Sequence, residues 1–331
     1  MKRVAFVLMV AIALMAWGSR VTSAHSNAQR GSELLQLLPD GNILAVIDVQ
    51  RMTGSSLWAT LSAQPKVKST LDKMQSDISE IGVRLSDIQT VALVFSGKDF
   101  DNPTVAVVGS FDQDGVLSHL RANPKIKLTS EKYKNYDVYK SVTVPASTPG
   151  DAQKPGAVPA PVKPNETAFY FIDSKTAVVG STAGVRASID VKSGSRASVA
   201  QNSKLTEAIA QNASAAIRFA ITMTPSMAGG LSSSLPIPDF SSVNLIFGAL
   251  NMASGVDLNA TLRSDTADHA KVVAERLNGL VMMFKGFLTS VGDPKMSAVN
   301  DALKSVSIVG NDIDVTITAS LPQEFFTQIF K

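Results

Sequence analysis

The stretch Val256-Asp-Leu-Asn-Ala-Thr-Leu-Arg263 alternates apolar and polar side chains from end to end. The same alternation recurs in Ile217–Thr222 and in Ile313–Ala319. Successive side chains of a strand point to opposite faces of its sheet, so this pattern predicts strands with one buried face and one solvated face. Such strands are typical of antiparallel sheets. The sequence therefore predicts an α+β fold in which helices pack on one face of antiparallel sheets.

Helices and further strands are predicted around these segments. Apolar residues recur at helical spacing over Pro65–Gly82 and again over Thr266–Val291. The compact apolar run Ile43–Val49 predicts a buried strand. Two tight hairpins are predicted, one around Lys134-Asn135 and the other around Gly310-Asn311.

A short motif occurs twice in the chain. Ala106-Val-Val-Gly-Ser110 recurs as Ala177-Val-Val-Gly-Ser181, and each copy ends a predicted pair of strands and precedes a predicted helix. A third pair of strands and a helix follow over Val243–Val291 without the motif. The recurrence predicts a fold built from repeated strand–strand–helix units.

The second copy runs into Gly180-Ser-Thr-Ala-Gly184, where a phosphate loop or a nucleophile elbow could form. The phosphate loop needs a following Gly-Lys-Ser/Thr, which is absent, and the elbow needs a serine where Thr182 stands. We therefore predict a turn glycine followed by a hydroxyl helix cap. Asp112, which follows the first copy, is predicted to be a helix N-cap as well.

The N-terminal residues have the pattern of a secretory leader. Lys2 and Arg3 precede an apolar run that ends at Trp17, and small residues lead to Ala24. This predicts a signal peptide over residues 1–24, cleaved between Ala24 and His25, with an uncleaved anchor as the alternative. The apolar run is shorter than the roughly twenty residues of a membrane-spanning helix. We expect an exported protein, periplasmic or extracellular, with no stable membrane span after processing.

The rest of the chain is long enough for about two domains at roughly 150 residues each. We predict a first α+β module over residues 25–195 and a second over 196–331. Prolines crowd the segment Pro145–Asn165, which is predicted to be a flexible loop or linker in the first module. The sequence leaves open whether the two modules share one sheet.

The charge balance argues against a nucleic-acid partner. The chain has 31 basic and 28 acidic residues, and Lys2, Arg3 and Arg20 lie in the leader, which has no acid. Removing the leader leaves 28 of each, so the mature chain is formally neutral. The chain also has no cysteine, which excludes disulfides, thiol catalysis, cysteine-based zinc sites and iron–sulfur clusters.

No residue pattern points to a specific chemistry. The three histidines are His25, His119 and His269, and none has the spacing of a catalytic zinc site, so no metal or cofactor is expected. A Ser-His-Asp triad is compatible with the sequence, because triad members come from distant positions. A hydrolase with a dispersed active site is therefore the alternative to a non-enzymatic protein.

The predicted helix over Thr266–Val291 is the most suggestive element. Its apolar stripe consists of Val273, Leu277, Leu280, Val281, Phe284, Leu288 and Val291. Met282, Met283 and Phe287 widen that stripe beyond one ordinary helix face. Either the helix is buried on two sides, or these three side chains contact an apolar ligand or a protein partner. The second reading indicates a non-enzymatic envelope protein that acts as a scaffold or as a binder of apolar ligands or protein partners.

Two short segments near the N-terminus carry a family resemblance. Leu38-Pro39-Asp40 followed by Ala45-Val-Ile-Asp-Val49 resembles the start of uncharacterised exported bacterial proteins of the domain-of-unknown-function type. The resemblance covers the first strand and the later strand–strand–helix units. It implies a periplasmic or extracellular setting and assigns no active site.

Overall fold

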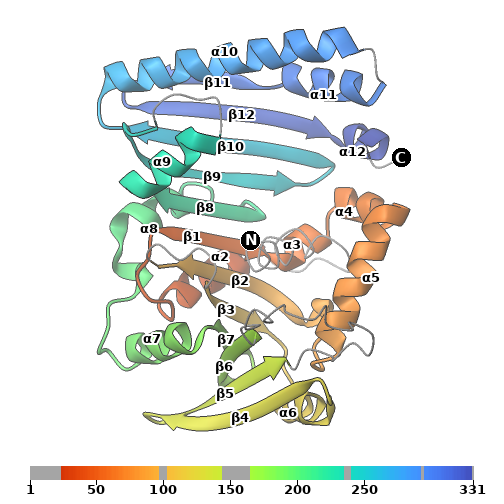
Figure 1. The fold of residues 1–331 in the computed structure, drawn as a ribbon, viewed down its shortest axis with the longest axis vertical. Coiled ribbons are helices and arrows are strands. Elements are labelled where there is room, and N and C mark those ends of the chain that lie inside the picture. The colour runs from red at the N-terminus through yellow and green to blue at the C-terminus, as the bar shows by residue number, and fades with distance from the viewer. Residues whose placement is uncertain (1–23, 97–102, 144–164, 235–239, 292–293, 330–331) are drawn as a thin grey trace, which may run out of the picture.

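The computed structural model describes residues 24–96, 103–143, 165–234, 240–291 and 294–329 (Figure 1). Its centre is one twelve-stranded sheet in the order β11-β12-β10-β9-β8-β1-β2-β3-β7-β6-β5-β4. Every neighbouring pair is antiparallel, which confirms the predicted α+β class with antiparallel strands. The strands are β1 (Ile43–Asp48), β2 (Ile88–Phe95), β3 (Thr104–Gly109), β4 (Ile126–Tyr133), β5 (Tyr136–Thr143), β6 (Asn165–Asp173), β7 (Thr176–Gly180), β8 (Ile217–Thr222), β9 (Val243–Met252), β10 (Gly255–Ser264), β11 (Ser307–Asn311) and β12 (Asp314–Pro322).

Helices connect these strands and cover the sheet. They are α2 (Ala24–Leu35), α3 (Val49–Thr53), α4 (Ser56–Ser62), α5 (Pro65–Ser79), α6 (Gln113–Ala122), α7 (Thr182–Lys192), α8 (Ser203–Ala210), α9 (Pro225–Ser234), α10 (Ala267–Val291), α11 (Pro294–Lys304) and α12 (Gln323–Ile329). Two short 3₁₀ turns, η1 (Leu85–Asp87) and η2 (Val199–Gln201), complete the described elements.

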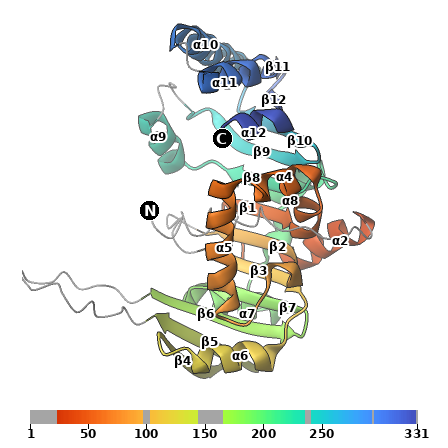
Figure 2. The same ribbon diagram turned by 90° about the vertical axis from the view of Figure 1, so that its right-hand side faces the viewer.

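Helices lie on both faces of the sheet, not on one face as the sequence predicted. Leu44 and Val46 of β1 belong to a buried cluster with residues of α2, α7 and α8, namely Leu34, Leu35, Val185, Ile189, Leu205 and Ile209. Ile47 of the same strand belongs to a second cluster with Trp58 of α4 and Leu71 of α5. Figure 2 shows α2 and α5 on opposite sides of the sheet. The reason is that β1 and β2 are apolar at successive positions, so both of their faces must be covered.

The alternating strands at the other end of the sheet behave as predicted. Leu262 of β10 and Val315 of β12 are buried in a third cluster with Ala270, Val273 and Ala274 of α10. The intervening residues of β10 are polar and point to the opposite face. Because every second residue of these strands is apolar, the apolar side chains of β10 and β12 lie on the face of the sheet that α10 covers.

The repeated motif does not produce repeated units in space. Its two copies lie on the neighbouring strands β3 and β7, where Ala106 pairs with Val178 and Val107 pairs with Ala177. This one-residue offset turns equivalent side chains to opposite faces. Accordingly, α6 packs with Phe169 in one cluster, whereas α7 packs on the other face with Tyr170. The predicted repetition of strand–strand–helix units is therefore not confirmed.

The two predicted modules share the sheet, because β1 pairs with β8 through residues such as Leu44 and Ala220. The hairpin around Lys134-Asn135 forms as predicted, with Lys134 at a φ of 52°. The second hairpin turns two residues later than predicted, because Asn311 still pairs with Asp314 and Asp312 takes the left-handed conformation at φ 52°.

Two predicted segments fall largely outside the described residues. These are the leader before Ala24 and the proline-rich segment up to Pro164. The predicted cleavage site, Ala24 and His25, lies at the start of α2, and Asn165 opens β6.

Candidate functional site

Helix α10 lies at the β11 end of the sheet, beside α11 (Figure 1). Thr266 precedes it, and the Thr266 hydroxyl accepts a hydrogen bond from the backbone N–H of His269 at 3.2 Å. Ala270, Val273, Ala274 and Leu288 are buried, so one side of the helix packs onto the sheet. The helix therefore has a fixed orientation, which decides what its other side presents.

Near its C-terminal end α10 also exposes large apolar side chains. Met282 is 72% exposed, Met283 56%, Phe284 51% and Phe287 64%. We call these four residues the α10 apolar patch. The structure thus rejects burial on two sides for Met282, Met283 and Phe287. It also places Phe284, which the sequence assigned to the buried stripe, in the exposed set.

The α10 apolar patch is comparable in size to the largest apolar patch of a typical monomer. If each side chain offers about 200 Å² when fully exposed, the four leave about 500 Å² of apolar surface in water. The largest patch on a typical monomer measures roughly 300–600 Å² and often has a function. Between Leu277 and Leu288 the helix carries only one charged residue, Lys285. The patch is therefore contiguous and almost uncharged.

A second candidate is a cavity of about 350 Å³ near the start of α10, lined by Ser241, Ser242, Asp265, His269, Val272, Val273 and Arg276. Nδ1 of His269 lies 2.6 Å from Oδ1 of Asp265, and this hydrogen bond is the main cause that holds the pKa of Asp265 below its ordinary value. Both side chains are about half exposed. The pair supplies the orienting carboxylate and the imidazole of a triad, and two serines also line the cavity.

Sequence reasoning missed this pair, although a signal was present. Asp265 and His269 are four residues apart at the start of a predicted helix, where side chains at i and i+4 meet. The serines are brought in by tertiary structure. The backbone N–H of Asp265 donates to the carbonyl of Ser242 at 3.0 Å, which joins the segment before β9 to the start of α10.

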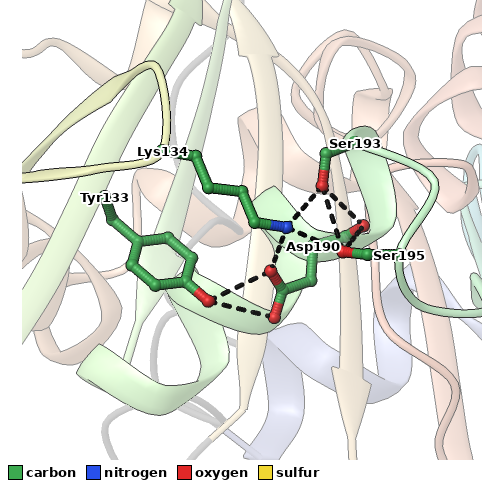
Figure 3. Close-up of polar contacts among 5 residues, drawn as sticks. All are labelled: Tyr133, Lys134, Asp190, Ser193 and Ser195. Carbon is green, nitrogen blue, oxygen red and sulfur yellow. Dashed lines mark hydrogen bonds and ion pairs between the residues drawn. The ribbon is translucent and has the colours of Figure 1, made fainter.

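A third candidate joins the β4–β5 turn to the end of α7 (Figure 3). Nζ of Lys134 lies 2.6 Å from Oδ1 of Asp190 and donates to the hydroxyls of Ser193 and Ser195, both at 2.7 Å. The hydroxyl of Tyr133 donates to the same carboxylate at 3.1 Å. A lysine beside a serine suggests a Ser–Lys catalytic pair, in which the lysine must be a neutral base.

The ion pair argues against that role for Lys134. The hydrogen bond from Lys134 is the largest effect on Asp190 and lowers the pKa of that carboxyl below 3.8. Nζ of Lys134 is already directed at three oxygen atoms, those of Asp190, Ser193 and Ser195. A charged ammonium has no lone pair with which to accept a proton from either serine. The cluster instead ties a hairpin turn to a helix end.

The predicted helix caps are confirmed. Ser181 precedes α7 and its hydroxyl accepts a hydrogen bond from the backbone N–H of Gly184 at 3.1 Å. Asp112 caps α6 in the same way, through the N–H of Gly115 at 3.0 Å. The segment after the second motif copy therefore forms the start of a helix, as expected.

The described residues lack both a metal-binding cluster and a membrane-spanning helix. In this part of the chain, no cluster of three or more histidine, aspartate or glutamate side chains could hold a metal ion. Nor does any helix there combine the length and apolar character that crossing a membrane requires.

Comparison with known proteins places the chain in no family. No protein-family model matches it, and no curated protein matches it. Among solved structures, crystal form I of TP0453 has a TM-score of 0.48 at 8% identity, covering 90% of this chain and 96% of that one. Crystal form IV of TP0453 has a TM-score of 0.47 at 8% identity, covering 92% and 99%. Similarity at this level carries no argument about function, and the resemblance noted from the sequence stays a prediction.

Proposed function

We propose that this is an exported, non-enzymatic envelope protein that binds an apolar ligand or a protein partner through the α10 apolar patch. The observation that carries the proposal is the exposure of Met282, Met283, Phe284 and Phe287 on one helix. Export rests on the leader pattern of residues 1–24.

The chemistry of the patch suits binding. Methionine is flexible and polarizable, so it adapts to apolar partners of varied shape. Phenylalanine adds a rigid surface, and covering such a side chain releases about 1.5–3 kcal/mol when burial is complete. Contact with a partner would thus remove the free-energy cost of exposing these apolar side chains to water.

An apolar probe dye such as anilinonaphthalene sulfonate tests the proposal. We expect the dye to bind the dilute protein, and Met283→Glu and Phe287→Glu each to weaken that binding by placing a charge in the patch. Val309→Glu is the matched control, because Val309 of β11 is 56% exposed but is outside the patch. Dye binding that is absent, or that Val309→Glu reduces equally, would count against the proposal.

The alternative function is a hydrolase that uses the Asp265–His269 pair. The observation that favours it is the 2.6 Å contact of that pair in a cavity with Ser241 and Ser242. A fluorophosphonate reagent should then label one of the two serines, and His269→Gln should abolish the labelling because the nucleophile would lose its base. A protein that takes up no label, or takes up the same label after His269→Gln, is not this hydrolase.

A further inference from the structure

A surface cavity of about 400 Å³ lies where the end of α2, the end of α7 and the 3₁₀ turn η2 meet. The side chains that line it are both polar and apolar, namely Gln36, Arg196, Ser198, Gln201, Val191 and Ala200. The cavity belongs to the α7 half of the molecule, whereas α10 lies at the opposite end of the sheet (Figure 1). Binding in this cavity would therefore be independent of the α10 apolar patch.

The backbone around the cavity is fixed by hydrogen bonds. Gly194 lines the cavity just after α7, takes a left-handed φ of 74° and donates its N–H to the carbonyl of Val191 at 2.9 Å. This turn directs the chain out of the helix toward η2. The N–H of Val199 donates to the carbonyl of Leu38 at 2.9 Å, which joins η2 to the segment that follows α2. The cavity is therefore formed by the fold before any ligand enters.

The polar side chains of the cavity have no hydrogen-bond partner among the described residues. Ser198 is the most informative of them, because the residue is only 8% exposed and its hydroxyl is still unpaired within the described part of the chain. Buried polar groups normally have a partner. Gln36, Arg196 and Gln201 are exposed, and no described residue bonds to their side chains either. All four groups are thus available to a molecule in the cavity.

Arg196 gives the cavity one positive charge. The Asp190 carboxylate, on which Arg196 acts electrostatically, is already paired with Lys134 at 2.6 Å (Figure 3). Arg196 forms no ion pair with an acid of the described residues, so its charge is left for a ligand. The C-terminal end of α7 also borders the cavity, and the partial negative charge of a helix C-terminus disfavours a ligand with several negative charges. The electrostatics therefore suit a single negative charge.

We propose that this cavity binds an organic molecule through its carboxylate, which pairs with the guanidinium of Arg196 and accepts a hydrogen bond from the hydroxyl of Ser198. A guanidinium and a carboxylate are both planar, so they can form two parallel hydrogen bonds. One carboxylate also supplies the single negative charge that the cavity suits. The volume of about 400 Å³ lies within the range of roughly 300–1,000 Å³ that is usual for small-molecule sites.

The other lining residues indicate what accompanies the carboxylate. The side-chain amides of Gln36 and Gln201 each offer donors and an acceptor, which match an amide group of the ligand. Val191 and Ala200 offer apolar contact to a small side chain. The C-terminal end of a peptide combines a carboxylate, an amide and a side chain, and so does an acylated amino acid. A simple organic acid shares only the carboxylate and an apolar tail.

Titration with N-acetyl-alanyl-alanine tests the proposal, followed by NMR at the backbone N–H of Gly194. A ligand of this size should bind with a dissociation constant of about 1 mM. The C-terminal amide of the same dipeptide should bind about 10-fold more weakly or worse, because it cannot form the paired contact with Arg196. Absence of binding by the acid up to about 10 mM, or equal binding by the amide, overturns the proposal. Equal binding by inorganic phosphate overturns the assignment to a carboxylate.

Substitutions locate the binding in the cavity. Arg196→Gln should raise the dissociation constant about 10-fold or more, and Ser198→Ala about 5-fold, because each removes a hydrogen-bond donor. Lys192→Gln is the matched control, since Lys192 carries the same charge next to Val191 but does not line the cavity. Circular dichroism should show that all three variants fold. If Lys192→Gln weakens binding as much as Arg196→Gln, the effect is one of general charge and the proposal is wrong.

Pentanoate distinguishes the two sources of the carboxylate. Binding of the dipeptide about 10-fold more tightly than pentanoate supports a peptide end or an acylated amino acid as the ligand. Equal binding supports a simple organic acid in the same carboxylate site. The dye experiment on the α10 apolar patch involves none of these residues, so failure of either proposal leaves the other standing.

Discussion

Replacing Leu288 and Met283 by alanine, one at a time, compares the two sides of α10. Leu288 is 9% exposed, so its removal leaves a cavity against the sheet, and such changes cost about 2–5 kcal/mol. Met283 is 56% exposed, and less than half of its burial energy of about 1.5–3 kcal/mol is realised in the monomer. Its loss should cost about 1 kcal/mol or less, because alanine is also a better helix former.

Denaturant unfolding of the dilute protein measures both free energies of unfolding. The two variants should have the same dependence on denaturant concentration as the parent and different midpoints. Leu288 is the buried reference because Leu280, although in the predicted stripe, is only half-buried. If both substitutions cause equally large losses, Met283 is a core residue and the argument for the α10 apolar patch is wrong.

Three further predictions concern other parts of the chain. Gly279→Ala should raise the free energy of unfolding of the monomer by about 0.5–1 kcal/mol in calorimetry, since the new Cβ meets open space. Burial raises the pKa of Tyr170 to about 12, above the ordinary 10.0, so its contribution is complete below pH 10 and lost as the pH rises toward 12. The parent should lose about 1.4 kcal/mol from this group between pH 8 and pH 11 in denaturant melts, and Tyr170→Phe should not show that loss. Asp190→Asn should cost at most about 1 kcal/mol at pH 7 because the pair with Lys134 is partly exposed. That difference should fade as the pH drops below 3.8, where Asp190 takes up its proton, and an equal cost at pH 7 and pH 2.5 would refute the ion pair.

Local patterns in the sequence determined several elements of this protein. Alternation over Val256–Arg263 predicted a strand with one apolar face, and that strand is β10. The turn at Lys134-Asn135 and the caps Asp112 and Ser181 were also predicted correctly. These features depend on residues a few positions apart, so their physical causes are present in the sequence itself.

Tertiary structure alone decided the arrangement of these elements. No local rule states that β1 pairs with β8 or that the two copies of the repeated motif pair with an offset of one residue. That offset sets which face the side chains of each copy occupy, and hence why α6 and α7 pack on opposite faces of the sheet. Met282, Met283 and Phe287 are apolar residues in an apolar helix, so sequence could identify them but could not tell whether they were buried. Their exposure follows from packing α10 onto the sheet by one side, which leaves these three side chains in contact with solvent.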